Sequence, residues 1–170
     1  MNQLTRESDQ NFGKDLLTQG KFLTFTLGEE TYGIGILKVK EIIGMLAITS
    51  VPQTPEFVKG IINLRGKVIP VLDLRLKFSM EPIPYTERTC IIVVEIESND
   101  VIVLIGIVVD SVSEVLNIKG EEIEDAPTFG MQLNTDYILG MAKTDGSIKI
   151  LLDIDRVLSS EELSGLGSVS

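Results

Sequence analysis

Short runs of apolar, β-branched residues recur along the whole chain, and turn-forming residues separate them at short intervals. Val, Ile and Thr dominate these runs, a composition typical of β-strands. Helix-period segments are few and short, at residues 54–59, 74–80 and 155–166. The pattern therefore predicts an all-β protein with a few short helices. The strand-like runs are FLTFTL, TYGIGI, IINL, VIPVLDL, CIIVVEI, VIVLIGIVV and IKILLDI.

The strand pattern repeats within the chain. Residues 60–74 (GIINLRGKVIPVLDL) align without a gap with residues 140–154 (GMAKTDGSIKILLDI), and glycine, aliphatic and aspartate positions coincide. Two further similarities precede this one in the same order: residues 35–43 match 108–116, and FLTFTL matches IIVVEI. Three similarities in one order predict two related halves.

We expect the first half to cover about residues 20–80 and the second about 88–158, each forming a barrel of about five strands. A small barrel leaves no exposed sheet edge. A unit of that size buries little apolar surface by itself, so we expect the two barrels to share a core and to unfold together. Residues 1–19 are polar and unpatterned, which predicts a disordered tail. Residues 161–170 are expected to hold the end of a C-terminal helix and a short tail.

The segment NLRGKVIP, residues 63–70, is predicted to form a hairpin. Gly66 tolerates the positive φ of a tight turn, Asn63 is a common turn residue, and Pro70 belongs at a sheet edge or bulge. None of this explains Arg65, whose counterpart in the repeat is Asp145. If folding required a cation at the turn, both halves should carry one. Arg65 is therefore a functional candidate, and drift at an exposed turn is the alternative.

The charge is unevenly distributed. The net charge is −10, with ten basic and eight acidic side chains in residues 1–78, and five basic and seventeen acidic in residues 79–170. The acidic balance argues against nucleic acid as a general partner. The most basic stretch, residues 59–77, surrounds the predicted hairpin. It is either a solvated surface or a docking face for an acidic protein.

Histidine is absent and Cys90 is the single cysteine, which excludes imidazole catalysis, Cys-His nucleophiles and His-containing metal sites. We interpret Cys90 as a core thiol. The pairs Asp110/Glu114 and Asp153/Asp155 are interpreted as capping or solvated carboxylates. We expect no catalytic residue, no metal and no cofactor. No apolar run reaches the ~18 residues of a membrane span, and the first residues lack a signal-peptide pattern, so we expect a cytoplasmic protein.

Three stretches in this order, GEETYGIGILKVKEII, ITSVPQTPEFVKGIINLRGKVIPVLDLRLKF and GIVVDSVSEVLNI, closely resemble the CheW family of bacterial chemotaxis coupling proteins over about residues 20–160. The resemblance implies two five-stranded SH3-like β-barrels packed around a shared hydrophobic core, and an adaptor without catalytic activity. The motifs that carry it are Val39-Lys40-Glu41-Ile42, Val51-Pro52, residues 60–66, and Asp73-Leu74-Arg75.

The resemblance also implies the partners: the cytoplasmic tip of methyl-accepting chemoreceptors and the regulatory domain of the histidine kinase CheA. Four residues, Val39, Glu41, Gly60 and Arg65, fall at positions of receptor or kinase contact in that family. Gly60 would allow a partner helix or strand to approach the backbone closely. A CheV-like coupler or a detached kinase regulatory domain is an alternative within the family. A small nucleic-acid-binding barrel is an alternative outside it, although aromatic residues make up only 5% of the chain.

Overall fold

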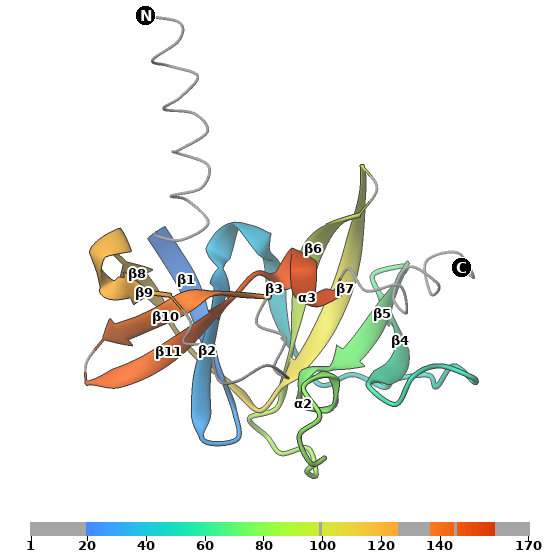
Figure 1. Cartoon of the computed structure of the whole chain (residues 1–170). Helices are drawn as coiled ribbons and strands as arrows, with labels where there is room; N and C mark the ends of the chain where they lie inside the picture. The colour runs from blue at the N-terminus through green and yellow to red at the C-terminus, as the bar shows by residue number, and fades with distance from the viewer. Residues whose placement is uncertain (1–19, 99, 126–136, 145, 159–170) are drawn as a thin grey trace, which may run out of the picture.

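The computed structural model describes residues 20–98, 100–125, 137–144 and 146–158. The expected tails at 1–19 and 161–170, and Asp145, lie outside these ranges. The described part is mostly strand, which confirms the all-β prediction (Figure 1). Its elements are β1 (Gly20–Leu27), β2 (Glu30–Gly35), η1 (Ile36–Lys38), β3 (Val39–Gly44), β4 (Val58–Leu64), β5 (Lys67–Asp73), α2 (Leu74–Lys77), β6 (Cys90–Ser98), β7 (Val101–Val109), β8 (Ser111–Ile118), η2 (Gly120–Glu122), β9 (Ile123–Glu124), β10 (Ile138–Thr144), β11 (Ser147–Leu152) and α3 (Ile154–Leu158).

The strands form two sheets, seen side by side in Figure 1. One has the order β8-β1-β2-β11-β10-β9, in which β9 is only two residues long, and lies on the left. The other has the order β3-β6-β7-β5-β4 and lies on the right. They correspond to the two SH3-like barrels, and we refer to them as the six-stranded and the five-stranded sheet.

Each sheet takes strands from both halves of the chain, which corrects the expected boundaries. Strands β1 and β2 pair with β8 and β11 of the second half, while β6 and β7 pair with β3 and β5 of the first. Neither barrel is therefore the contiguous stretch 20–80 or 88–158. The repeat reveals which segments are strands, but not which strands exchange hydrogen bonds, and the same pattern fits both arrangements.

The two halves nevertheless follow one plan. Hairpins β4–β5 and β10–β11 are eighty residues apart, and both shift register beside a glycine, Gly60 or Gly140. A short helix follows each hairpin. Where each hairpin ends, the Asp73 N–H donates to the Phe57 carbonyl, and the Asp153 N–H donates to the Tyr137 carbonyl, both at 2.8 Å. The aspartates aligned in the sequence thus have the same structural place.

The buried residues form three clusters, because alternate side chains of a strand point to opposite faces. Ile91 and Val93 of β6 pack inside the five-stranded sheet, whereas Ile92, Val94 and Ile96 face the other sheet. The large cluster between the sheets contains residues from both, and we call it the shared core. Its fully buried members include Phe25, Leu27, Ile34, Leu72, Leu74, Ile92, Val94 and Ile107.

An ion pair fixes the crossover from β7 to β8. The Arg75 guanidinium of α2 lies 2.7 Å from Asp110 Oδ2, and the two side chains are only 11% and 19% exposed. The same carboxylate oxygen accepts a 2.7 Å hydrogen bond from the Gly28 N–H at the end of β1. Asp110 is therefore a structural carboxylate in a largely buried ion pair, not the capping or solvated group expected from the sequence.

A second ion pair occupies the corresponding place at the crossover from β2 to β3, with the charges exchanged. Here the crossover supplies the cation, Lys38, whose Nζ lies 2.6 Å from Asp155 Oδ2 of α3. The other oxygen of Asp155 accepts from the Glu97 N–H at 3.2 Å. Both crossovers are thus held to a short helix, α2 after the β4–β5 hairpin or α3 after the β10–β11 hairpin.

The strand exchange predicts a single unfolding transition for the whole domain. Ile92→Ala removes a fully buried side chain from the shared core and should lower the free energy of unfolding by about 2–5 kcal/mol. Differential scanning calorimetry should show one transition, shifted as a whole, with matching calorimetric and van't Hoff enthalpies. Two separate transitions, only one of them shifted, would contradict the shared core.

Candidate functional site

The tip of the β4–β5 hairpin is a two-residue turn. Leu64 still pairs with Lys67, and between them Arg65 and Gly66 have φ of 51° and 88°. Two positive φ values in a two-residue loop match the twist of the flanking strands. The side chain of Asn63 stabilises the turn, since its Oδ1 accepts the Gly66 N–H at 2.9 Å. The predicted hairpin is confirmed, and its loop consists of Arg65 and Gly66.

Arg65 forms an ion pair with Glu41, so the structure brings two of the four predicted site residues together. The Arg65 Nη2 donates to Glu41 Oε1. Glu41 lies on β3 and Arg65 follows β4, and these strands are the two edges of the five-stranded sheet. The ion pair therefore bridges the edges of the sheet at the end of the barrel. The side chains are 72% and 29% exposed, which leaves both charges accessible to a partner.

A groove of about 300 Å³ opens around this ion pair, and we call it the mouth groove. Its walls come from β3, β4, β5, β6 and β7, so it forms only when the strands of both halves are assembled. Apolar side chains are set between charged ones, an arrangement that suits a protein segment with both characters. The lining residues are Lys40, Glu41, Leu64, Arg65, Lys67, Ile69, Val93 and Leu104.

Val39, the third predicted residue, is half-buried and packs against the shared core. It begins β3, and the register of β3 against β6 shifts between Val39 and Glu41. Its neighbour Lys40 lines the mouth groove, while Lys38 lines a second cavity. Val39 therefore links two candidate surfaces.

Gly60, the fourth predicted residue, has a structural role instead. It is buried with φ of 142°, and a Cβ placed there would lie 2.0 Å from the carbonyl oxygen of Thr49. Thr49 approaches so closely because it exchanges two 2.9 Å backbone hydrogen bonds with Ile61. The chain's own backbone occupies the space that glycine provides, and the partner contact expected at Gly60 stays a prediction.

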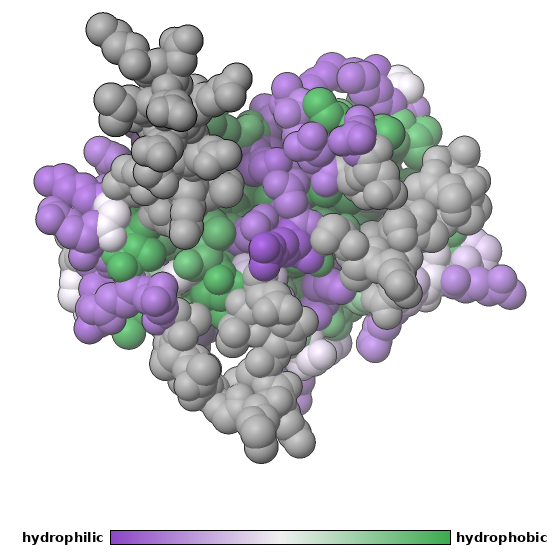
Figure 2. All heavy atoms as spheres, turned by 45° about the horizontal axis from the view of Figure 1, so that its top comes forward, coloured by the Kyte–Doolittle hydropathy of each residue, from purple (hydrophilic) through white to green (hydrophobic). Residues whose placement is uncertain are grey.

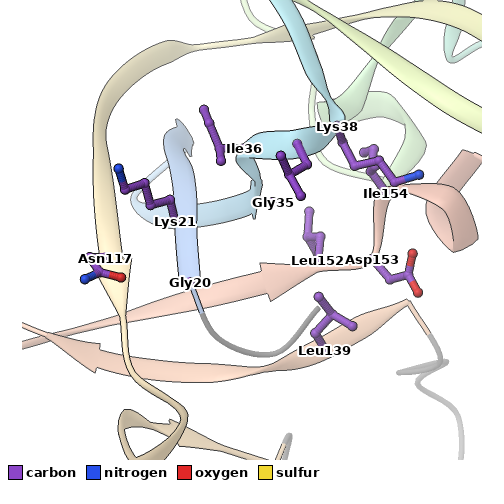
Figure 3. A pocket seen from close by; sticks show the side chains of 11 residues that line it. Gly20, Lys21, Gly35, Ile36, Lys38, Asn117, Leu139, Leu152, Asp153 and Ile154 are labelled. Carbon is purple, nitrogen blue, oxygen red and sulfur yellow. The ribbon is translucent and has the colours of Figure 1, made fainter. Parts of the chain in front are cut away.

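The second cavity, of about 480 Å³, was not anticipated from the sequence, and we call it the junction pocket. Figure 3 shows Ile36, Leu139 and Leu152 gathered in it, with Lys21 on one side and Lys38 on the other. Apolar side chains also gather on the upper face of the molecule over the six-stranded sheet (Figure 2). The lining comes from seven separate elements, so no local sequence pattern could have identified the pocket.

The basic stretch 59–77 is not one uniform cationic face. Lys77 Nζ lies 4.5 Å from the centre of the Phe57 ring, and Lys59 Nζ lies 5.8 Å from that of Tyr85. Tyr85 in turn donates to Asp73 Oδ2 at 3.0 Å, and burial, followed by the nearby carboxylate, raises the pKa of its hydroxyl. Of the basic residues in this stretch, Arg65 and Lys67 line the mouth groove.

The described residues offer no group of three or more acidic or cysteine side chains that could hold a metal ion. Within the same ranges, no helix is long and apolar enough to cross a membrane. Cys90 is half-buried rather than enclosed in the core; it packs against the shared core, and its thiol donates to the Arg88 carbonyl at 3.1 Å.

Comparison with known proteins agrees with this geometry. A family model described as the CheW-like domain matches residues 21–162. The chemotaxis protein CheW of Klebsiella aerogenes is 44% identical over 150 residues, which cover 88% of this chain and 88% of that protein. CheW of Rhizobium meliloti is 31% identical over 153 residues, 89% of this chain and 96% of that protein. The crystal structure of the scaffolding protein TtCheW from Thermoanaerobacter tengcongensis superposes with a TM-score of 0.73 at 36% identity, covering 85% and 95% of the two chains.

The geometry at Gly60 generates a stability prediction. Gly60→Ala combines a positive φ with a clash against backbone, so the free energy of unfolding should fall by roughly 3 kcal/mol or more. Gly44→Ala is the matched control, because a Cβ at Gly44 meets nothing within 4 Å. That variant should stay within about 1 kcal/mol of the parent. Urea denaturation measures both, and equal stability of the two variants would refute the structural role of Gly60.

Proposed function

Because the chain belongs to the CheW-like family, we propose that it is a non-catalytic adaptor of bacterial chemotaxis in the cytoplasm, where it couples methyl-accepting chemoreceptors to the histidine kinase CheA. The observation that carries the proposal is the family match over residues 21–162, together with Glu41 and Arg65 of the family motifs meeting in one accessible groove. The relatives it matches are named as chemotaxis proteins, and its structural neighbour as a scaffolding protein.

The mouth groove supplies the chemistry that an adaptor needs. A partner segment can place apolar side chains against Leu64, Ile69 and Leu104. A guanidinium has five N–H donors, and Arg65 uses one on Glu41, so the others can bind a carboxylate or carbonyl of the partner. Glu41 also restrains the arginine side chain, which lowers the entropy lost on binding.

The shared core gives the adaptor its rigidity. The chain reaches both candidate surfaces around the start of β3: Lys38 of η1 lines the junction pocket, and Lys40 and Glu41 line the mouth groove. Val39 between them is packed on the shared core. Two partners bound at these surfaces would be held in a fixed relation, which is the physical requirement for coupling a receptor to a kinase.

The alternatives receive less support. The CheW proteins reported above are covered over 88% and 96% of their length, which favours the adaptor over a CheV-like coupler or a kinase regulatory domain. A nucleic-acid-binding barrel would need aromatic rings for base stacking on its basic surface. Among the described residues that line the mouth groove, none is aromatic.

Arg65→Ala should weaken binding to the receptor tip or the kinase regulatory domain by about 1–3 kcal/mol, because it removes a charge-assisted contact. The free energy of unfolding should change by less than about 1 kcal/mol, since the ion pair is largely exposed. Arg65→Asp should bind more weakly still. Isothermal titration calorimetry with each partner separately measures the affinities.

Two further variants sharpen this experiment. Asp145→Ala changes the aligned turn position of the second half and should bind both partners like the parent protein. The exchange Glu41→Arg with Arg65→Glu keeps an ion pair but reverses its direction, so it should not restore binding if Arg65 contacts the partner itself. Unchanged affinity of Arg65→Ala for both partners would leave it a solvated turn residue. Unfolding of Arg65→Ala would instead make the arginine structural.

A further inference from the structure

The β6–β7 hairpin is longer than its counterpart in the first half. Strands β1 and β2 end at the pair Leu27–Glu30, which a two-residue turn closes. The repeat aligns Leu27 with Ile96, yet β6 and β7 continue for two more pairs, Glu97–Ile102 and Ser98–Val101. The hairpin projects from the top of the molecule (Figure 1). We call Glu97, Asp100, Val101 and Ile102 the hairpin extension.

The hairpin extension exposes apolar side chains that folding does not require. Val101 is 58% exposed and Ile102 67%, whereas the β7 residues that follow become progressively buried. Side chains two apart on a strand share a face, so Ile102 lies on the same face as Leu104, which lines the mouth groove. Ile102 therefore continues the apolar lining of the groove outward along β7.

The hairpin extension and Arg65 lie at the same end of the five-stranded sheet. Strands β5 and β7 run parallel, and each follows directly on its hairpin turn, so both tips point the same way. The paired stretch covers Val71–Asp73 on β5, well away from those tips. The mouth groove occupies the space between them, with Lys67 on the β5 side and Leu104 on the β7 side.

The tip of the β4–β5 hairpin and the hairpin extension carry opposite charge, while Lys40 and Glu41 of β3, which also line the groove, are paired with Glu95 and Arg65. Arg65 and Lys67 provide cations on the β4–β5 side. Exposed Glu97 and Asp100 provide anions on the hairpin extension, which contains no basic residue. A segment lying across the mouth would thus meet anions and apolar side chains at one end and cations at the other, and this polarity fixes its direction.

We propose that the hairpin extension is a docking arm that holds and orients the partner segment in the mouth groove. The segment it fits is amphipathic, with apolar side chains against Ile102 and Leu104 and a Lys or Arg at the end facing Glu97 and Asp100. The inference rests on the proposed function, because it takes the occupant to be the partner that Arg65 binds.

The chain itself supplies the variant that tests the arm. Replacing residues 97–102 by Gly-Glu, the turn of β1–β2, shortens the hairpin to the length of its counterpart. Position 97 keeps the backbone N–H that donates to Asp155, and the buried residues of both strands are untouched. Affinity for the receptor cytoplasmic fragment and for the kinase regulatory domain is measured by isothermal titration calorimetry. We expect at least a tenfold loss for the same partner that loses affinity with Arg65→Ala.

Point variants keep the test decisive if the shortened hairpin fails to fold. Val101→Ser with Ile102→Ser should reproduce the loss, and so should Glu97→Lys with Asp100→Lys. The matched control is Glu29→Lys with Glu30→Lys, which makes the same change of charge on the exposed β1–β2 hairpin and should leave affinity unchanged.

The results of these experiments distinguish a failure of the docking-arm proposal from a failure of the proposed function. If Arg65→Ala loses affinity but the hairpin variants bind like the parent, the docking arm is wrong and the proposed function stands. If the Ser variants abolish self-association in sedimentation velocity without changing partner affinity, the patch binds a second copy of the chain and the inference is wrong. If the parent protein binds neither partner, the proposed function is wrong, and the docking-arm proposal, which rests on it, is wrong as well.

Discussion

The fold depends on one constraint: neither half of the chain can complete a barrel from its own strands. Each pair of leading strands, β1–β2 and β6–β7, finds its neighbours in the other half, through an antiparallel contact on one side and a parallel contact on the other. Opening either barrel therefore separates strands of both halves. The shared core follows from this exchange, because β1, β2, β6 and β7 each present one face to the space between the sheets. The rigidity and the mouth groove follow as well.

The crossovers show what such an exchange requires of individual residues. At each crossover, a partly buried carboxylate pairs with a cation and accepts a backbone N–H, from Gly28 just after β1 or from Glu97 near the end of β6. Asp110 does this from the crossover with Arg75 on the helix, and Asp155 does it from the helix with Lys38 on the crossover. The two ion pairs have the same arrangement, but the acidic and the basic residue exchange positions between the crossover and the helix. The repeat aligns Arg75 with Asp155, but it places Asp110 opposite Leu37 rather than Lys38, so an alignment alone would miss this equivalence.

The sequence was sufficient for the strands, the repeat, the hairpin with Asn63 and Gly66, and the two-barrel architecture. It was insufficient for strand pairing, because apolar periodicity records which face of a strand is buried and not which strand lies beside it. For the same reason the contact between Glu41 and Arg65, which are far apart in the chain, was not predicted, although the family resemblance singled out both residues. The structural role of Gly60 was also out of reach, since its sequence position cannot show that Thr49 fills the space beside it.

The internal repeat distinguishes positions that have the same geometric role in both halves from positions at which the halves differ. Positions that recur in both halves, such as Gly60 with Gly140 and Asp73 with Asp153, have matching geometric roles: each glycine would clash with its own chain if it carried a Cβ, and each aspartate N–H closes the same loop. Positions that differ include the turn at Arg65 and the length of the β6–β7 hairpin. These two differences are distant in sequence, yet both lie at one end of the five-stranded sheet. A molecule built from two similar halves can bind different partners only where the halves differ, and here those differences converge on the mouth groove.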